Sequence, residues 1–266
     1  MEIPPIECNV CGTAVSGVLV TKDGFSVYQC ADCGLAFTHP RPEFAAAQYD
    51  SSYFDVYRRR RRFRLKRADA RLRRIELIRE PGLLLDIGCS LGYFVEAANA
   101  RGWRAVGLEI SSCAADEARR LGVEVRTGVL ERAGYADGEF DCVTMWDVLE
   151  HVPDPTRHML EVRRILKPRG MVVIGTPNIA HPRFRLGRQR WRHLKPTEHV
   201  FYFQESSLHR LLAETGFELV SPRVLGGRTF RGSLGAVLSV AACRLAPIND
   251  VMIAYGVRNG LKIPQD

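Results

Sequence analysis

The sequence predicts an α/β protein whose main domain is a doubly wound, mostly parallel sheet, preceded by a small β subdomain. Three observations predict this class. From residue 83 onward, short apolar runs typical of buried strands alternate with segments of helical periodicity, a pattern that builds a parallel sheet with helices on both faces. A glycine-rich turn follows the first of these strands, and two cysteine pairs stand before residue 40. A chain of 266 residues accommodates one large domain and a small appendage.

Periodicity and turn residues place the individual elements. Strands are expected at 83–87, 103–109, 123–127, 140–146, 171–176, 217–224 and 251–257. Helices are expected at 93–100, 114–121, 156–166, 205–215 and 234–245. Residues 81–266 are therefore expected to form the main domain.

The composition is that of an ordinary folded protein. Apolar residues make up 46% of the chain and charged residues 26%, which excludes a disordered class. The first ten residues lack the basic flank and apolar core of a signal peptide. The weakly polar run 234–243 is too short to span a bilayer. We therefore expect a cytoplasmic protein without a transmembrane segment.

Four of the eight cysteines follow a metal-binding pattern. Cys8-x-x-Cys11 and Cys30-x-x-Cys33 are separated by 18 residues, and two such turns can present four thiolates to a tetrahedral zinc ion. The residues between the pairs form two β-rich runs joined by an Asp-Gly dipeptide, which predicts a hairpin. Residues 1–40 are therefore expected to form a zinc ribbon. Four thiolates leave no open coordination position, so the zinc is expected to be structural.

Positive charge is concentrated after the cysteines. The chain has a formal net charge of +8, and residues 58–74 hold eleven Lys/Arg and one Asp. The excess of positive charge lies entirely in this segment. Apolar residues in 54–78 recur mainly at steps of three and four, so residues 41–80 are expected to form a linker and a basic amphipathic helix. This helix face is either merely solvated or attracts an anionic small substrate, RNA or anionic lipid.

The turn after the first expected strand reads Asp86-Ile-Gly88-Cys-Ser90-Leu-Gly92. In a doubly wound sheet, ligands bind outside the carboxyl ends of the strands, so this turn lies in the cofactor position. A dinucleotide-binding turn would carry its third glycine where this chain has Tyr93, and the lysine of a phosphate-binding loop is absent. The turn therefore indicates a nucleoside ligand without phosphate.

Residues downstream of this turn complete a family pattern. Glu109 ends the second expected strand, where a carboxylate can accept hydrogen bonds from both ribose hydroxyls. The turn and Glu109, followed by DVLEHVPDP at 147–155, LKPRG at 166–170 and TPN at 176–178, resemble class I S-adenosylmethionine-dependent methyltransferases. The similarity is greatest to the branch that includes quinone and small-molecule methyltransferases. It covers about residues 83–260 and implies a Rossmann-like, seven-stranded sheet with an antiparallel last strand.

The resemblance also implies roles for residues of the site. It places Asp86, Gly88 and Gly92, with Cys89 and Ser90 of the same turn, at the methionine end of the cofactor, Glu109 at the ribose, Ile110 and Val129 at the adenine, and Trp146 with Asp147 at the sulfonium. This chain departs from the family pattern at two positions. Ser90 replaces the usual middle glycine, and Val129 replaces the usual acid near the adenine amine.

Methyl transfer requires an aligned acceptor and, for a hydroxyl or carbon acid, a base. The candidates for the base are His151 and His199, and each also has a structural interpretation. The resemblance places the segment around His199 over the acceptor site. We expect a small-molecule acceptor such as a sugar, a lipid-linked compound or a secondary metabolite. The nearby arginines either hold an anionic acceptor or lie in a solvated loop; they are Arg183, Arg185, Arg190 and Arg192.

Two alternatives remain open. An RNA methyltransferase could use the basic helix and the ribbon, although the basic run contains one aromatic residue, Phe63, where stacking platforms for bases are expected. A non-catalytic scaffold could bind the cofactor without transferring its methyl group. The pattern does not predict an oligomeric state.

Overall fold

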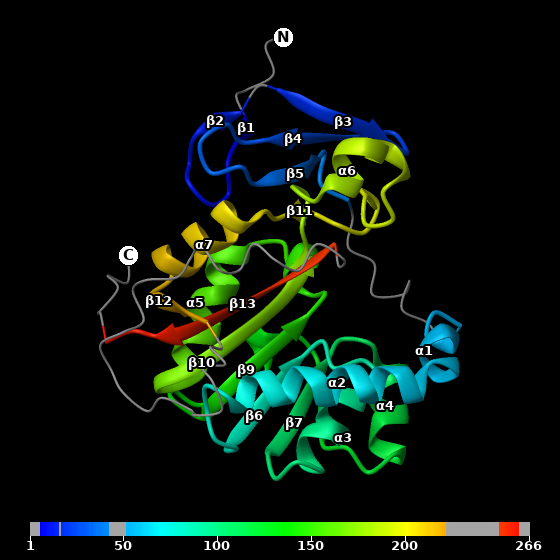
Figure 1. The fold of residues 1–266 in the computed structure, drawn as a ribbon, viewed down its shortest axis with the longest axis vertical. Helices are drawn as coiled ribbons and strands as arrows, with labels where there is room; N and C mark the ends of the chain where they lie inside the picture. The colour runs from blue at the N-terminus through cyan, green and yellow to red at the C-terminus, as the bar shows by residue number, and fades with distance from the viewer. Residues whose placement is uncertain (1–5, 16, 43–51, 222–249, 261–266) are drawn as a thin grey trace, which may run out of the picture.

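A seven-stranded sheet forms the centre of the main domain (Figure 1). The computed structural model describes residues 6–15, 17–42, 52–221 and 250–260. In chain order the strands of this sheet are β6 (Leu83–Ile87), β7 (Arg104–Glu109), β8 (Val125–Thr127), β9 (Phe140–Trp146), β10 (Leu166–Pro177), β12 (Phe217–Val220) and β13 (Val251–Arg258). Their spatial order is β12-β13-β10-β9-β6-β7-β8.

The strand directions match the expected topology. The pairs β6–β7, β7–β8, β6–β9 and β9–β10 are parallel, whereas β13 is antiparallel to both of its neighbours, β10 and β12. The expected doubly wound sheet with an antiparallel last strand is confirmed. The strand order reverses at β6, which lies between β7 and β9, and a ligand crevice is expected at such a switch point.

Helices cover both faces of the sheet (Figure 1). One face packs against α2 (Arg61–Glu76), α3 (Tyr93–Asn99) and α4 (Ser112–Arg120), and the other against α5 (Pro155–Ile165) and α7 (Glu205–Glu214). Ala68, Leu72 and Ile75 form the buried stripe of α2. The short helix α1 (Asp55–Arg59) precedes α2 and is separated from it by Arg60, so the expected basic helix is present in two segments.

Side-chain caps fix where two of these helices begin. The carboxylate of Asp154 accepts a hydrogen bond of 3.0 Å from the backbone N–H of Arg157, and Pro155 opens the first turn of α5. The hydroxyl of Ser111 accepts a hydrogen bond from the backbone N–H of Ala114 at the start of α4. Both caps lie at the carboxyl-terminal edge of the sheet, where the site is built.

The small subdomain is a β ribbon. β1 (Ile6–Glu7) pairs with β2 (Ala14–Val15), and β3 (Val18–Lys22), β4 (Phe25–Gln29) and β5 (Ala36–His39) form an antiparallel sheet. The expected hairpin turn between β3 and β4 has positive φ at Asp23 and Gly24. A strand of the main domain, β11 (Phe201–Tyr202), extends this sheet beside β5. The ribbon and the main domain therefore share one sheet.

The segment between β10 and α7 attaches the ribbon to the main domain. It contains α6 (Pro182–Gly187), the 3-10 helix η4 (Arg188–Arg190) and β11, and its buried residues share an apolar cluster with Val20, Val27 and Ala36 of the ribbon. The hydroxyl of Thr38 donates to the carbonyl of His199, and the hydroxyl of Ser206 donates to the carbonyl of Cys33, both at 2.8 Å. The ribbon thus holds the chain on both sides of β11.

Most of the expected elements are present. The strands expected at 83–87 and 140–146 have the observed bounds, while β10 is longer than expected. The helix expected at 234–245, with Cys243, lies outside the described residues. The sequence did not predict α6 or β11. Among the described helices, none has both the length and the apolar character needed to cross a bilayer.

Candidate functional site

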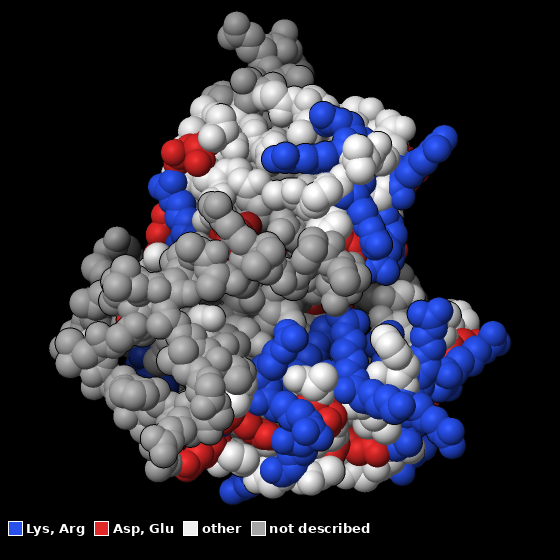
Figure 2. Space-filling model, in the orientation of Figure 1, with Lys and Arg blue, Asp and Glu red and all other residues white. Residues whose placement is uncertain are grey.

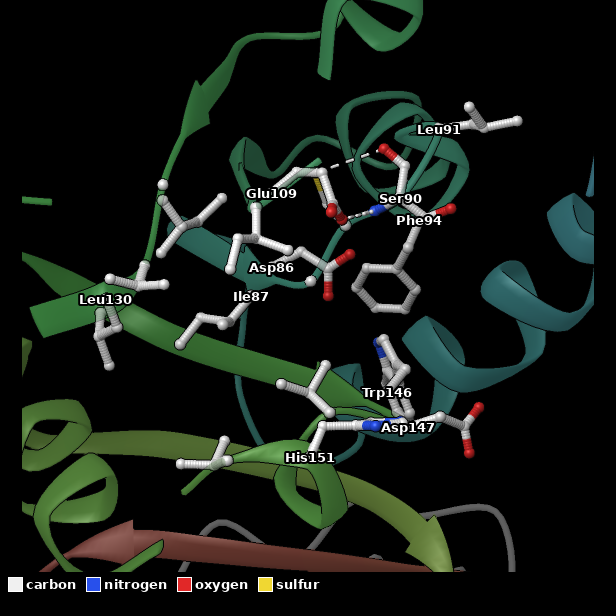
Figure 3. Close-up of a pocket in the computed structure, with 18 of the residues that line it drawn as sticks. Asp86, Ile87, Ser90, Leu91, Phe94, Glu109, Leu130, Trp146, Asp147 and His151 are labelled. Carbon is white, nitrogen blue, oxygen red and sulfur yellow. Dashed lines mark hydrogen bonds between the residues drawn. The ribbon is translucent and has the colours of Figure 1, made fainter. Parts of the chain in front are cut away.

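A cavity of about 700 Å³ lies at the carboxyl ends of β6, β7, β8 and β9. Its walls are the turns after these strands, the 3-10 helix η3 (Leu149–His151), the start of α5 and, on the remaining side, α1 and α2. In Figure 3, Asp86 and Glu109 extend from neighbouring strands toward the space bounded by Phe94 and Trp146. The volume suits a small-molecule ligand, because such pockets typically enclose about 300–1,000 Å³.

The turn after β6 needs glycine at position 88. Gly88 has a φ of +69°, and a Cβ there would lie 2.5 Å from a methyl carbon of Val148. Ser90 also has a positive φ, of +53°, which a serine adopts less readily than a glycine. Its backbone N–H donates a hydrogen bond of 2.8 Å to Oε2 of Glu109. This bond offsets part of the strain at Ser90 and ties the turn to the end of β7.

Glu109 is 7% exposed and lines the cavity. Besides the bond to Ser90, its Oε1 accepts a 2.8 Å hydrogen bond from the backbone N–H of Ser111. Burial raises the pKa of the Glu109 carboxyl, and these backbone donors oppose that rise. Each carboxylate oxygen can accept more than one hydrogen bond, so Glu109 keeps capacity for ligand hydroxyls.

Asp86 is buried at the end of β6 and lines the same cavity. Burial raises the pKa of Asp86 to about 7, although the hydroxyl of Thr144, 2.6 Å from Oδ1, and the charge of Arg71 both act to lower it. Such a carboxyl is poised between its neutral and ionised forms near neutral pH. A cationic ligand beside it would favour the ionised form.

A cation from α2 faces these carboxylates. The guanidinium carbon of Arg71 lies 3.7 Å from the ring centroid of Trp146, and Nη2 of Arg71 is buried without a hydrogen-bond partner among the described residues. Burial, helped by the charge of Arg67, lowers the pKa of Arg71 to about 10, while Asp147 and Asp86 act in the opposite direction. The guanidinium stays charged at neutral pH, and its free N–H group is available to an anionic ligand atom.

Three side chains meet beside the part of the cavity that His151 lines. The rings of His151 and His199 have their centroids 4.7 Å apart and cross at 88°. Nδ1 of His151 lies 2.9 Å from the carbonyl oxygen of Glu198. A carbonyl can only accept, so the proton is assigned to Nδ1 and the lone pair to Nε2. His151 lines the cavity, whereas His199 is buried behind it.

Glu150 completes this group. A carboxylate oxygen of Glu150 and ring nitrogens of His151 and His199 all lie within 4.8 Å of one another, close enough to hold a metal ion. Burial, with the charge of Asp147, raises the pKa of Glu150 to about 8. Burial also lowers the pKa of His151 and, more strongly, that of His199. Near neutral pH the two imidazoles are therefore uncharged.

Comparison with known proteins identifies the family. A family model described as a methyltransferase domain matches residues 57–222, which is more than half of the chain. The chain belongs to this methyltransferase family. The class I fold that the sequence pattern implied is thereby confirmed, together with its expected seven-stranded sheet.

Individual relatives match parts of the chain. An uncharacterized 37.1 kDa protein in transposon Tn4556 of Streptomyces fradiae is 34% identical over 124 residues, which are 41% of this chain and 36% of that protein. The ubiquinone biosynthesis O-methyltransferase of Methylococcus capsulatus is 29% identical over 175 residues, 61% of this chain and 74% of that enzyme. The enzyme of the same name from Alkalilimnicola ehrlichii is 34% identical over 102 residues, 36% of this chain and 41% of that enzyme.

Solved structures share the fold. A S-adenosylmethionine-dependent methyltransferase of Thermotoga maritima, described as a possible histamine N-methyltransferase, has a TM-score of 0.55 and 21% identity, covering 78% of this chain and 97% of that one. A protein of Pyrococcus horikoshii has a TM-score of 0.57 and 18% identity, covering 82% of this chain and all of that one. At these identities the likeness concerns the fold.

The cavity brings together nearly all residues expected at the methyltransferase cofactor. Those on its wall are Asp86, Gly88, Cys89, Ser90, Glu109, Ile110, Val129, Trp146 and Asp147. Gly92 lies outside the wall and begins α3 with a φ of +75°. A Cβ on Gly92 would lie 3.1 Å from the side chains of Ala118 and Val123. Gly92, the last residue of the turn, therefore lets α3 start close to Ala118 of α4 and to Val123.

The sequence pattern did not predict the cavity wall that α1 and α2 of this methyltransferase contribute. Tyr57, Arg64 and Arg71 line the cavity from these helices, and Tyr53 lines it from the turn before α1. The guanidinium carbon of Arg64 lies 3.5 Å from the ring centroid of Tyr57. One signal was present in the sequence, because Arg71 lies three residues after Ala68 and is adjacent to Leu72. This spacing puts Arg71 near the buried stripe of α2, on the side of the helix that faces the main domain.

The four expected zinc ligands converge in the ribbon. The sulfur atoms of Cys8 and Cys33 are 3.5 Å apart, as are those of Cys11 and Cys30, and all four lie within 4.8 Å of one another. A tetrahedral ion with Zn–S bonds of about 2.3 Å separates its sulfurs by about 3.8 Å. The cluster therefore fits a structural zinc ion, with four ligands from two turns.

Proposed function

We propose that this chain is an active methyltransferase that binds S-adenosylmethionine in the cavity beside β6. The observation that carries the proposal is that three acids, Asp86, Glu109 and Asp147, and one buried cation, Arg71, line the same cavity. S-adenosylmethionine carries a sulfonium, an ammonium and a carboxylate besides its ribose. A cavity lined by both signs of charge, with Glu109 at the ribose position, suits this ligand.

Each part of the donor then has a partner. We assign the ribose hydroxyls to Glu109, the methionine ammonium to Asp86 and the methionine carboxylate to Arg71. Ile110 and Val129 supply apolar contacts for the adenine. The free hydroxyl of Ser90, buried without a partner among the described residues, adds one hydrogen-bonding group at the methionine end.

We further propose a small molecule with a hydroxyl group as acceptor. The relatives named as ubiquinone biosynthesis O-methyltransferases support this class. So does the wall near His151, which combines the apolar Val148, Val152 and Pro153 with Arg157. An acceptor with an apolar body and an anionic group fits this mixture. Sugar, lipid-linked and secondary-metabolite acceptors all fall within this class.

His151 is proposed as the base. Its Nε2 holds the lone pair and the ring is uncharged, so it can take the proton of the acceptor hydroxyl while the oxygen attacks the methyl carbon. The C–S bond breaks as the C–O bond forms, and the electron pair of the C–S bond stays on sulfur. His199 lies behind His151 and is hydrogen-bonded through its carbonyl to Thr38 of the ribbon. We assign His199 to packing of the His151 ring.

The experiment follows the methyl group. Methyl-labelled S-adenosylmethionine is incubated with the protein and a cell extract, which is then separated into aqueous metabolites, lipids and RNA. Label in the metabolite or lipid fraction, lost with Glu109→Ala, supports the proposal. Label in RNA would favour the RNA methyltransferase alternative. Tight cofactor binding with no label in any fraction would favour a non-catalytic scaffold.

A further inference from the structure

The solvent-exposed side of α1 and α2, away from the buried residues Ala68, Leu72 and Ile75, carries an apolar stripe. Phe63, Ala70 and Leu77 follow one another at seven-residue steps, which places them close to one line along α2. Val56 lies seven residues before Phe63, on α1. Val56 is 53% exposed, Phe63 63% and Leu77 40%, and Ala70 is exposed as well. Large apolar side chains are thus held in solvent from Val56 to Leu77, a span of about six helical turns, although the same helices have a separate buried stripe.

Basic side chains flank this stripe. Arg59, Arg60, Arg62, Lys66 and Arg74 are exposed and have no ion-pair partner in the part of the chain that the structure describes. Figure 2 shows Arg and Lys gathered over the region of α1 and α2.

The acids of the same segment do not neutralise these cations. Asp55 pairs with Arg58, Asp69 with Arg73 and Arg101, and Glu76 with Arg101. We call the four apolar and five basic residues the basic stripe face.

We propose that the basic stripe face docks on the surface of an anionic lipid bilayer. A helix that lies in a membrane interface combines Lys and Arg, which meet anionic headgroups, with apolar side chains that enter the headgroup–acyl boundary. Phe63 and Leu77 would supply the apolar contacts here, with Arg62, Lys66 and Arg74 beside them.

RNA binding would explain the basic residues of the basic stripe face but not its apolar residues. Phosphate binding requires positive charge, and readout of single-stranded bases requires several aromatic platforms. The face offers one aromatic ring, Phe63, whereas Val56, Ala70 and Leu77 are aliphatic. Aliphatic side chains between basic ones make no favourable contact with a phosphate backbone. Against a bilayer they are stabilised, because they can enter the headgroup–acyl boundary.

Docking on this face would place the cavity beside the bilayer. Arg64, Arg67 and Arg71, from the same helix α2, line the cavity. An apolar acceptor held in the membrane would then be separated from the cavity by a single helix. The docking proposal does not depend on methyl transfer, since it concerns the outer surface of the helices.

The test uses the full chain and sedimentation with vesicles. One set contains equal parts of phosphatidylcholine and phosphatidylglycerol, and the other contains phosphatidylcholine only. We expect binding to the anionic vesicles that is at least about tenfold tighter than to the neutral ones and weakens with added salt. Equal binding to both sets, or no binding to either, would overturn the proposal.

Variants separate the bilayer from RNA. Phe63→Ser with Leu77→Ser should weaken vesicle binding at least about tenfold because both apolar contacts are lost, while Arg120→Gln with Leu121→Ser, an exposed pair on α4, should leave vesicle binding unchanged. Each variant is checked for an unchanged melting temperature and unchanged S-adenosylmethionine affinity, since none of these side chains lines the cavity. RNA binding is measured by fluorescence anisotropy. If the Phe63/Leu77 variant keeps its RNA binding and its vesicle binding is also unchanged, the face is assigned to RNA and the bilayer proposal is refuted.

Discussion

The guanidinium of Arg71 lies over the indole ring of Trp146, with its central carbon 3.7 Å from the ring centroid. One residue comes from the basic helix α2 and the other from the carboxyl end of β9, so the contact closes the cofactor cavity between them. A cation against an aromatic face is stabilised by the ring quadrupole. The contact holds a buried positive charge opposite Asp86 and Asp147 without neutralising it.

Arg71→Gln is expected to weaken S-adenosylmethionine binding about 10- to 100-fold, because a charge-assisted contact to the methionine carboxylate is worth about 1.5–3 kcal/mol. Isothermal titration calorimetry measures the effect. Arg73→Gln is the matched control, since Arg73 lies on the exposed side of the same helix and pairs with Asp69. Equal losses in both variants would mean that helix charge in general, rather than this contact, attracts the cofactor.

His151→Asn is expected to lower kcat about 100-fold or more, the usual contribution of a general base, while the affinity for S-adenosylmethionine stays unchanged. Burial lowers the pKa of His151, so the ring remains an uncharged base as pH falls through 6.5. The acid limb of the kcat profile should therefore lie below pH 6.5. An acid limb above pH 6.5, or an acid limb that persists in His151→Asn, would mean that another group is the base.

A chelator distinguishes a base from a metal ligand at the same place. Glu150, His151 and His199 could hold an ion, yet catalysis through His151 as a base needs none. We expect EDTA to leave the initial rate unchanged in protein whose ribbon zinc is verified by elemental analysis. A loss restored by magnesium or manganese would transfer His151 from the role of base to that of ligand.

Zinc is expected near one equivalent per chain. Because the ribbon packs on the segment around His199, replacing Cys30 by serine should lower the melting temperature and the rate of methyl transfer. Ribbon residues do not line the cavity in the described part of the chain, so S-adenosylmethionine affinity should change much less than the rate. A metal-free preparation with full stability and full activity would contradict the ribbon assignment.

Cofactor affinity should depend on pH through Asp86. The pKa of Asp86 in the free protein is raised to about 7 by burial, and the cationic groups of the cofactor favour its ionised form. Below pH 7 binding must therefore release a proton, and affinity should fall by up to about tenfold per pH unit. Calorimetry across pH tests this, with Asp86→Asn as the variant that should bind weakly and without this dependence. A flat profile in the parent protein would show that Asp86 does not sense the ligand.

Local patterns explain why so much of the cofactor site was predictable. The turn from Asp86 to Gly92 and the acid at Glu109 are set by short-range geometry, because strand, turn and helix follow one another within a few residues. The same holds for the cysteine pairs, whose spacing determines how two turns can meet around one ion. These residues converge in the structure as the spacing implied.

Long-range packing explains what was missed. The arginine run looked uniform in the sequence, and the contacts that separate Arg71, against Trp146, from Arg62, in solvent, depend on how α2 crosses the sheet. The pairing of β11 with β5 joins residues more than 160 positions apart, beyond the reach of any local pattern. The same pairing places His199 behind His151. Because no local pattern reveals this arrangement, the sequence did not distinguish the two histidines as candidate bases.

The most direct test of the account is calorimetric titration of S-adenosylmethionine into the parent protein and into Glu109→Ala. We predict one binding site per chain in the parent and a loss of at least about tenfold in affinity in the variant, since a carboxylate that accepts hydrogen bonds from the ribose hydroxyls contributes about 1.5–3 kcal/mol. Unchanged affinity in Glu109→Ala, or no binding to the parent protein, would contradict the placement of the cofactor in this cavity.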